Sequence, residues 1–293
     1  DDTPSTSSSK PKDIIHDDVC SICFDDVSIL DVETYILYEC CGKVMHLKCN
    51  DQLHDTKSLS VETKNSCPMC RAKNVASGSK EQIERLQKWS QRNRSWAQCS
   101  LGNVYYHGHG VNRDPKHACE LFKLAADQGH HHAQYSLGIM YDKGEGVIQS
   151  DQLSFKYYKL SADQGFANAQ FNVGNGYTQG TGVEQSDTEA FKYYKLAAEQ
   201  GICVAQYQLG FMYEEGKGVI QSDTLSFKYY KLSAEAGDAD AQCNVGAYYA
   251  SKGVDGVDQS FTEAREWWTK AAKQGDKEAI KGLKILDEIQ GIK

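Results

Sequence analysis

A 36-residue period is the feature that most limits what this chain can fold into. The pair Ala-Gln occurs five times at this interval, with a glycine five residues and a tyrosine eight residues after each alanine. The alanines are Ala97, Ala133, Ala169, Ala205 and Ala241, the glycines are Gly102, Gly138, Gly174, Gly210 and Gly246, and the tyrosines are Tyr105, Tyr141, Tyr177, Tyr213 and Tyr249. A fixed period of this length predicts an array of stacked units, each burying its apolar face against its neighbours.

Each unit begins with the pattern of one helix. Ala133, Leu137 and Tyr141 are spaced four residues apart and share one helical face. The glycine inside this helix costs about 1 kcal/mol relative to alanine. Its recurrence in every unit predicts that a neighbouring helix approaches too closely for a Cβ atom. The helix is expected to end at the Gly-x-Gly-Val string.

A second helix completes each unit. Its expected first residues follow good N-cap side chains, which are Asp114, Ser150, Ser186, Ser222 and Ser260. Glu189 and Glu263 lie three residues after a capping serine and predict capping boxes. Expected left-handed glycine stops are Gly129, Gly165, Gly201, Gly237 and Gly275. Phe155, Tyr158 and Ala162 are expected to pack inward.

The strings Ala-x-x-x-Leu-Gly-x-x-Tyr, Gly-x-Gly-Val and Tyr-Tyr-x-x-Ala-Ala-x-Gln-Gly resemble the Sel-1-like repeat, a relative of the tetratricopeptide repeat. The resemblance implies an α-solenoid whose concave face binds a protein substrate or adaptor. The units would be 97–132, 133–168, 169–204, 205–240 and 241–278, followed by a closing helix at 279–293. The expected fold is thus mostly α, with about five helix pairs after a small zinc module.

Residues 76–96 form a linker and then an amphipathic helix with a row of basic side chains. Ile83, Leu86 and Trp89 lie on one stripe of this helix. The helix is interpreted as a cap on the repeats, with a basic docking surface as the alternative. Residues 1–16 are polar and low in apolar content, which predicts a disordered tail.

A cluster of cysteines and one histidine lies within residues 17–75. Its members are Cys20, Cys23, Cys40, Cys41, His46, Cys49, Cys67 and Cys70. Eight thiolate and imidazole ligands make two tetrahedral zinc sites, and a segment this short needs the metal to fold. The two zinc ions are therefore expected to be structural. Disulfides are the alternative, which His46 and the lack of a secretory signal disfavour.

The strings Cys20-Ser-Ile-Cys23 and Cys67-Pro-Met-Cys70-Arg71 resemble those of a RING finger, the zinc module of many ubiquitin ligases. The resemblance implies a cross-braced arrangement with two sites. Site one would hold zinc with Cys20, Cys23, His46 and Cys49, and site two with Cys40, Cys41, Cys67 and Cys70.

The chain departs from the common RING pattern at its second ligand pair. Where a histidine or cysteine usually lies two residues after Cys41, this chain has Lys43, whose ammonium group cannot coordinate zinc. Cys40 is expected to complete the site. A three-thiolate site with a weak or water-filled fourth position remains open.

The RING resemblance implies a ubiquitin-protein transferase without a covalent intermediate. Such a module holds a ubiquitin-charged conjugating enzyme so that the thioester is presented to a substrate lysine. Ile22 and Pro68 match the family's apolar contacts to the conjugating enzyme, and Arg71 matches its cation between that enzyme and ubiquitin. The alternatives are local packing for Ile22 and Pro68 and an ordinary solvated charge for Arg71.

Two further interpretations of the zinc module remain open. The first is a non-enzymatic scaffold with a structural zinc module, which Lys43 and the adjacent Cys40 and Cys41 favour. The second is a reader of histone tails, because PHD fingers share the ligand order. Those fingers usually carry an aromatic residue where this chain has Asn65, so the RING reading is preferred.

Composition restricts the class of partner. The net charge of −8 disfavours a general nucleic-acid binder, and no apolar run is long enough to span a membrane. A cytoplasmic protein is expected, with a nuclear location left open. Cys99, Cys119, Cys203 and Cys243 are widely spaced and are expected to be reduced thiols. The run His130-His131-His132 is interpreted as a turn rather than a metal site.

Overall fold

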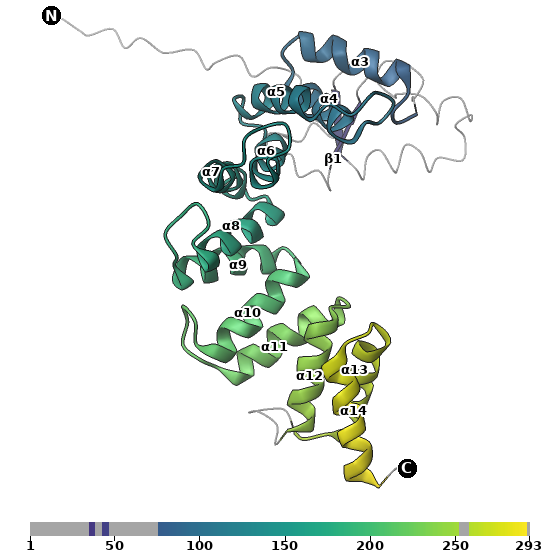
Figure 1. Cartoon of the computed structure of the whole chain (residues 1–293), viewed down its shortest axis with the longest axis vertical. Coiled ribbons are helices and arrows are strands. Elements are labelled where there is room, and N and C mark those ends of the chain that lie inside the picture. The colour runs from purple at the N-terminus through teal and green to yellow at the C-terminus, as the bar shows by residue number, and fades with distance from the viewer. Residues whose placement is uncertain (1–34, 39–42, 47–75, 252–257, 292–293) are drawn as a thin grey trace, which may run out of the picture. The chain divides into compact units, whose positions relative to one another are not determined.

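The computed structural model describes residues 35–38, 43–46, 76–251 and 258–291 (Figure 1). In this part of the chain nearly all regular structure is helical, which confirms the predicted α-solenoid. The helices are α3 (Lys80–Gln91), α4 (Ser95–His107), α5 (Pro115–Ala126), α6 (His131–Lys143), α7 (Asp151–Ala162), α8 (Ala167–Gln179), α9 (Asp187–Glu199), α10 (Cys203–Glu215), α11 (Asp223–Glu235), α12 (Ala239–Ala250), α13 (Phe261–Lys273) and α14 (Lys277–Gln290). No helix among these residues is both long and apolar enough to cross a membrane.

Two short strands lie in the predicted zinc module. β1 (Tyr35–Tyr38) pairs antiparallel with β2 (Lys43–His46), and Tyr35 is opposite His46. The predicted ligand His46 is therefore the last residue of a strand. The seven predicted cysteine ligands lie outside the described residues, and so does each proposed contact to the conjugating enzyme.

The chain divides into two compact units, with the boundary after Leu121. In the first unit, Ile83 and Leu86 of α3 are buried against Leu101 and Val104 of α4. Helix α3 therefore covers the first helix of the first repeat, as the capping interpretation predicts. In the second unit, each helix from α6 to α14 packs on the next one along the chain.

The predicted caps fix where the second helices begin and end. The four predicted serine caps each accept a hydrogen bond from a backbone N–H three residues later, at 3.2–3.3 Å. Asp114 does the same for His117 at 3.0 Å. The five glycines after the second helices all have positive φ, from 86° to 102°. The reciprocal half of both predicted capping boxes, at Glu189 and Glu263, is missing, because the Ser186 N–H donates to the Tyr177 carbonyl oxygen at 3.0 Å and the Ser260 N–H to that of Tyr249 at 2.9 Å.

In the second to fifth repeats, the glycine inside the first helix is explained by an aromatic ring. A Cβ at Gly138 would lie 2.5 Å from the Tyr158 ring, and a Cβ at Gly174 would lie 2.6 Å from the Tyr194 ring. Gly246 faces Trp268 in the same way, at 2.5 Å. The predicted close approach is confirmed, and the group that approaches is a side chain of the second helix.

Aromatic contacts join one repeat to the next. Phe155 meets Tyr177 edge-on with ring centroids 5.2 Å apart, and Phe191 meets Tyr213 at 5.4 Å. Phe227 and Tyr249 repeat the contact at 5.4 Å. Each such pair adds about 0.5–1.5 kcal/mol beyond the area it buries. The same side chains recur every 36 residues, so the same interface forms again between neighbouring helix pairs.

Candidate functional site

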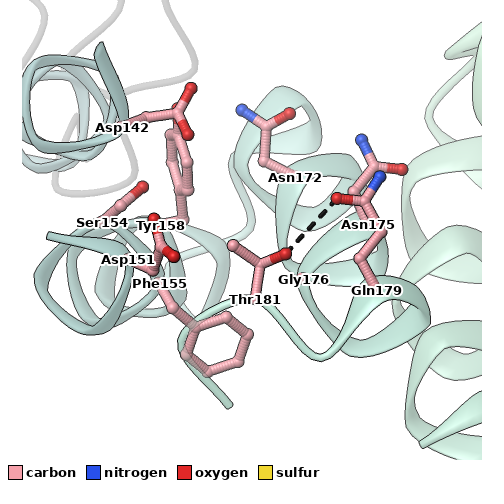
Figure 2. A pocket seen from close by; sticks show the side chains of 10 residues that line it. All are labelled: Asp142, Asp151, Ser154, Phe155, Tyr158, Asn172, Asn175, Gly176, Gln179 and Thr181. Carbon is pink, nitrogen blue, oxygen red and sulfur yellow. Dashed lines mark hydrogen bonds between the residues drawn. The ribbon is translucent and has the colours of Figure 1, made fainter. Parts of the chain in front are cut away.

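A pocket of about 190 Å³ lies where the second and third repeats meet (Figure 2). Its walls come from the end of α6, the first turns of α7, the last turns of α8 and the loop after α8. The lining residues are Asp142, Asp151, Ser154, Phe155, Tyr158, Asn172, Asn175, Gly176, Gln179 and Thr181. Most of these side chains are polar, and Phe155 and Tyr158 supply the aromatic wall.

Several polar groups in the pocket are already used within the protein. The Ser154 hydroxyl donates to the Gly138 carbonyl oxygen at 3.0 Å, and Asn175 Oδ1 accepts a hydrogen bond from the Tyr194 hydroxyl at 2.7 Å. The Thr181 hydroxyl donates to Gln179 Oε1 at 3.4 Å, as Figure 2 shows. These bonds fix the shape of the walls.

The carboxylates of Asp142 and Asp151 are the uncommitted groups of the pocket. Both residues are exposed, and neither carboxylate makes a hydrogen bond or ion pair with another residue that the structure describes. Two carboxylates beside carboxamides and an aromatic wall can receive a cationic or hydrogen-bond-donating group from a partner.

The equivalent position in the next two repeats is occupied internally. Thr178 corresponds to Asp142 and is hydrogen-bonded to the Tyr194 hydroxyl at 3.0 Å. In the fourth repeat, the Tyr230 hydroxyl donates to Glu214 Oε2 at 2.7 Å. Burial and then this carboxylate raise the pKa of Tyr230 above its usual value. The second repeat therefore presents a carboxylate at a position whose side chain the third and fourth repeats use for their own packing.

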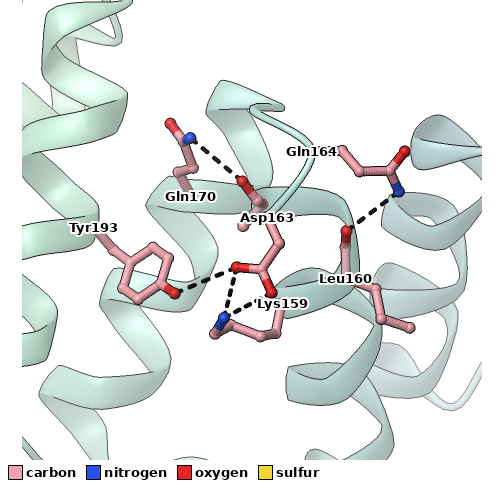
Figure 3. Close-up of polar contacts among 7 residues, drawn as sticks. Lys159, Leu160, Asp163, Gln164, Gln170 and Tyr193 are labelled. Atoms are coloured by element: carbon pink, nitrogen blue, oxygen red, sulfur yellow. Dashed lines mark hydrogen bonds and ion pairs between the residues drawn. The ribbon is translucent and has the colours of Figure 1, made fainter.

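Polar contacts between the end of α7 and α9 also hold the second and third repeats together (Figure 3). Lys159 Nζ binds the Asp163 carboxylate at 2.7 Å and lies 5.4 Å from the centre of the Tyr193 ring. The Tyr193 hydroxyl in turn donates to Asp163 at 3.5 Å. A lysine, an aspartate and a tyrosine from two repeats thus form one cluster.

The histidine run lies at the start of α6. His130 Nδ1 accepts a hydrogen bond from the Ala133 N–H at 3.4 Å and caps the helix. The centroids of the His131 and His132 rings are 4.4 Å apart, and His132 meets Phe166 edge-on at 4.7 Å. Burial and the neighbouring histidines lower the pKa of His130 and that of His132 to about 4. The run therefore caps and begins α6, and the interpretation of it as a turn is wrong for His131 and His132.

Two of the four widely spaced cysteines are held as neutral thiols. Cys99 is buried, and burial raises its pKa to about 12. Cys243 is half-buried, and burial together with Asp276 raises its pKa to about 12. Thiols with such pKa values are poor nucleophiles at neutral pH. Among the described residues, no group of three or more His, Cys, Asp and Glu side chains is placed to hold a metal ion.

The sequence pattern does not predict the pocket between the second and third repeats. None of its residues belongs to a recognised chemical motif, and its walls come from three helices and a loop. The one available signal was the residue after the repeated tyrosine, which is Asp142, Thr178 or Glu214 in successive units. Differences at a fixed place in a repeat mark positions that the common packing does not require.

The comparisons with known proteins concern the helical part of the chain. The model of the Sel1 repeat family matches residues 97–130, 131–166, 167–202, 203–238 and 239–276. No curated protein sequence matches the chain.

Two solved structures resemble the fold. One is c5321, a protective antigen of uropathogenic Escherichia coli strains with an SLR fold, at 33% identity and a TM-score of 0.68. The match covers 74% of this chain and 46% of the antigen, so this chain spans less than half of the antigen's length. The other is a Sel1 repeat protein from Oxalobacter formigenes, at 30% identity and a TM-score of 0.63, covering 69% of this chain and 80% of that protein. With five consecutive matches to the family model, the chain belongs to the Sel1 repeat family.

Proposed function

We propose that this chain is a protein-interaction scaffold whose repeats bind a polypeptide partner at the pocket between α6, α7 and α8. The observation that carries the proposal is the pair of uncommitted carboxylates, Asp142 and Asp151, in a pocket with ordered walls. Ordered walls favour binding because little conformational entropy is lost when a partner docks. The repeat family supports a binding role.

A capture experiment with the full chain tests this function. The immobilised wild-type chain should retain at least one protein from a lysate of its source cells. Asp142→Lys combined with Asp151→Lys should abolish that retention, because cations would replace the carboxylates. Glu235→Lys with Glu266→Lys is the matched control, since both residues are exposed, lie outside the pocket and change the charge equally. Equal retention by both double variants would contradict the proposal.

The pattern of zinc ligands favours a second function, that of a RING-type ubiquitin ligase. In this proposal the two zinc ions fold residues 17–75, Ile22, Pro68 and Arg71 hold a charged conjugating enzyme, and the repeats hold the substrate. The support is the ligand spacing and the residues beside the ligands in the sequence. The positions of these residues lie outside the described part of the chain.

A ubiquitination assay separates this function from a scaffold alone. With conjugating enzymes and ubiquitin, the full chain should form ubiquitin conjugates, and Ile22→Ala or chelation of zinc should abolish them. A zinc-loaded chain that binds no conjugating enzyme would leave the scaffold as the function. Unchanged activity in Ile22→Ala would instead remove only the proposed contact.

A further inference from the structure

Two isoleucines are the most exposed large apolar side chains that the structure describes. Ile148 is 91% exposed and Ile220 is 90% exposed. Both occupy the same place in the loop between the two helices of a repeat, within the identical string Gly-Val-Ile-Gln-Ser-Asp. Single exposed apolar residues are ordinary on protein surfaces. Two exposed isoleucines at the same place in different repeats form a pattern that the packing of the repeats does not explain.

The loops that carry these isoleucines are ordered by their own hydrogen bonds. The Ser150 N–H donates to the Tyr141 carbonyl oxygen at 3.0 Å, and the Ser222 N–H donates to that of Tyr213 at 2.9 Å. Gln221 Nε2 also donates to the Glu214 carbonyl oxygen at 2.9 Å. An apolar side chain on a fixed loop can dock with little loss of backbone entropy.

The loops of the second, third and fourth repeats lie along one edge of the stack. A Cβ at Gly182 would overlap the Asp151 carbonyl oxygen of the preceding repeat, and a Cβ at Gly218 would overlap that of Asp187. Each loop therefore rests on the first turn of the preceding second helix. We call residues 142–153, 178–189 and 214–225 the loop edge.

The loop edge is strongly acidic. Its two cations are Lys143 and Lys217, and its nine carboxylates belong to Asp142, Glu145, Asp151, Glu184, Asp187, Glu189, Glu214, Glu215 and Asp223. Three of the aspartates lie at helix starts, where they stabilise the helix dipole. The summed field still favours a cationic partner and repels nucleic acid and anionic membranes. Glu184 is exposed and occupies in the third repeat the place that isoleucine holds in its neighbours.

We propose that the loop edge binds a basic polypeptide segment that carries two apolar side chains. One apolar side chain contacts Ile148, the other contacts Ile220, and a cationic residue between them lies over Glu184. This inference rests on the proposed scaffold function and specifies the chemistry of the partner.

The probe is a phage-displayed library of random 16-residue peptides selected on the immobilised full chain. Enriched peptides should carry net positive charge and at least two apolar residues, and their affinity is then measured by fluorescence polarisation. Ile148→Asn with Ile220→Asn should weaken binding tenfold or more, since each isoleucine loses a buried apolar contact. Glu184→Lys should weaken binding several-fold, and less so at high salt, because salt screens exposed charges.

Asparagine is the natural residue at the equivalent place in the first repeat, Asn112, so the isoleucine variants should fold. The matched control is Ile285→Asn with Ile289→Asn, since these isoleucines are 56% and 62% exposed on α14 and lie outside the loop edge. Its affinity for the peptides should stay within twofold of wild type. Circular dichroism should give the same helix content for every variant.

Three outcomes would overturn the inference. They are an absence of enriched peptides, enriched peptides without positive charge, and equal affinity for wild type and the double isoleucine variant. A wild-type dimer that Ile148→Asn with Ile220→Asn dissociates would assign the edge to a second copy of the chain instead. If the lysate capture still depends on Asp142 and Asp151, the scaffold function stands although this inference fails.

Discussion

At the scale of single residues, paired glutamines connect the helices of the stack. Gln164 Nε2 donates to Gln134 Oε1 at 2.6 Å, and Gln200 Nε2 donates to Gln170 Oε1 at 2.7 Å. Gln200 Nε2 also lies 3.0 Å from the Gly165 carbonyl oxygen of the preceding repeat. Glutamine suits this role because its side chain both donates and accepts. The fourth repeat has Ala236 at the donor position, so the equivalent bond to Gln206 cannot form.

Ala236→Gln should therefore stabilise the protein by about 0.5–1.5 kcal/mol, the net value of a typical hydrogen bond. The new amide would donate to Gln206 Oε1, as Gln164 and Gln200 donate in their repeats. The free energy of unfolding in urea measures the effect. Ala236→Glu is the matched control, because a carboxylate of the same shape cannot donate. An equal gain from glutamate would show that side-chain packing, and not the hydrogen bond, is responsible.

At the scale of elements, the same first-helix start is capped differently from repeat to repeat. Asp238 and Asp276 cap α12 and α14 with a carboxylate oxygen, whereas His130 caps α6 with a ring nitrogen. A protonated Nδ1 has no lone pair to accept the bond from Ala133. The start of α6 therefore depends on a neutral imidazole.

Stability should consequently fall as the pH drops from about 6.5 towards 4. The pKa of His130 and that of His132 are lowered to about 4 in the folded chain, so the unfolded chain takes up these protons first. The loss should be on the order of 2–3 kcal/mol for each histidine at pH 4.5 and nearly absent above pH 7. Urea unfolding between pH 7.5 and 4.5 measures it.

His130→Asp is the control for this pH dependence, because aspartate keeps the cap and stays charged at pH 5. The variant should lose less stability than wild type between pH 7 and pH 5. Parallel curves for the two proteins would contradict a role for His130. The variant should keep the part of the pH dependence that comes from His132. The Nε2 atom of His132 is buried without a hydrogen-bond partner among the described residues.

The boundaries of the helices could be predicted well, and the contacts of individual side chains could not. Serine caps and glycine stops act through neighbouring backbone, so Ser186 and Gly201 mark the ends of α9 in the sequence itself. The capping boxes at Glu189 and Glu263 failed because the Ser186 and Ser260 N–H groups donate to the carbonyl oxygens of Tyr177 and Tyr249 instead. Those oxygens belong to the preceding helix, so the outcome depends on how the two helices pack, which no local sequence pattern states.

At the scale of the whole molecule, the surfaces proposed here exist only because repeats stack. Contacts in the second unit run mainly between consecutive helices, so its stability is approximately a sum of neighbouring interfaces. The pocket and the loop edge each draw residues from more than one repeat. Variants that fold but lose binding therefore test a surface, and the ubiquitination assay tests residues 17–75 separately.

The sequence by itself determined the repeat, its two helices, their caps and the need for glycine where a helix meets an aromatic ring. These features follow from local backbone chemistry and from a period that every unit shares. The zinc module and its contacts Ile22, Pro68 and Arg71 remain predictions from the ligand pattern. Only the tertiary structure decided that Asp142 is left uncommitted while Glu214 is used internally, and that Ile148 and Ile220 face solvent from one edge. Those outcomes depend on distances between residues that are remote in sequence, which packing alone sets.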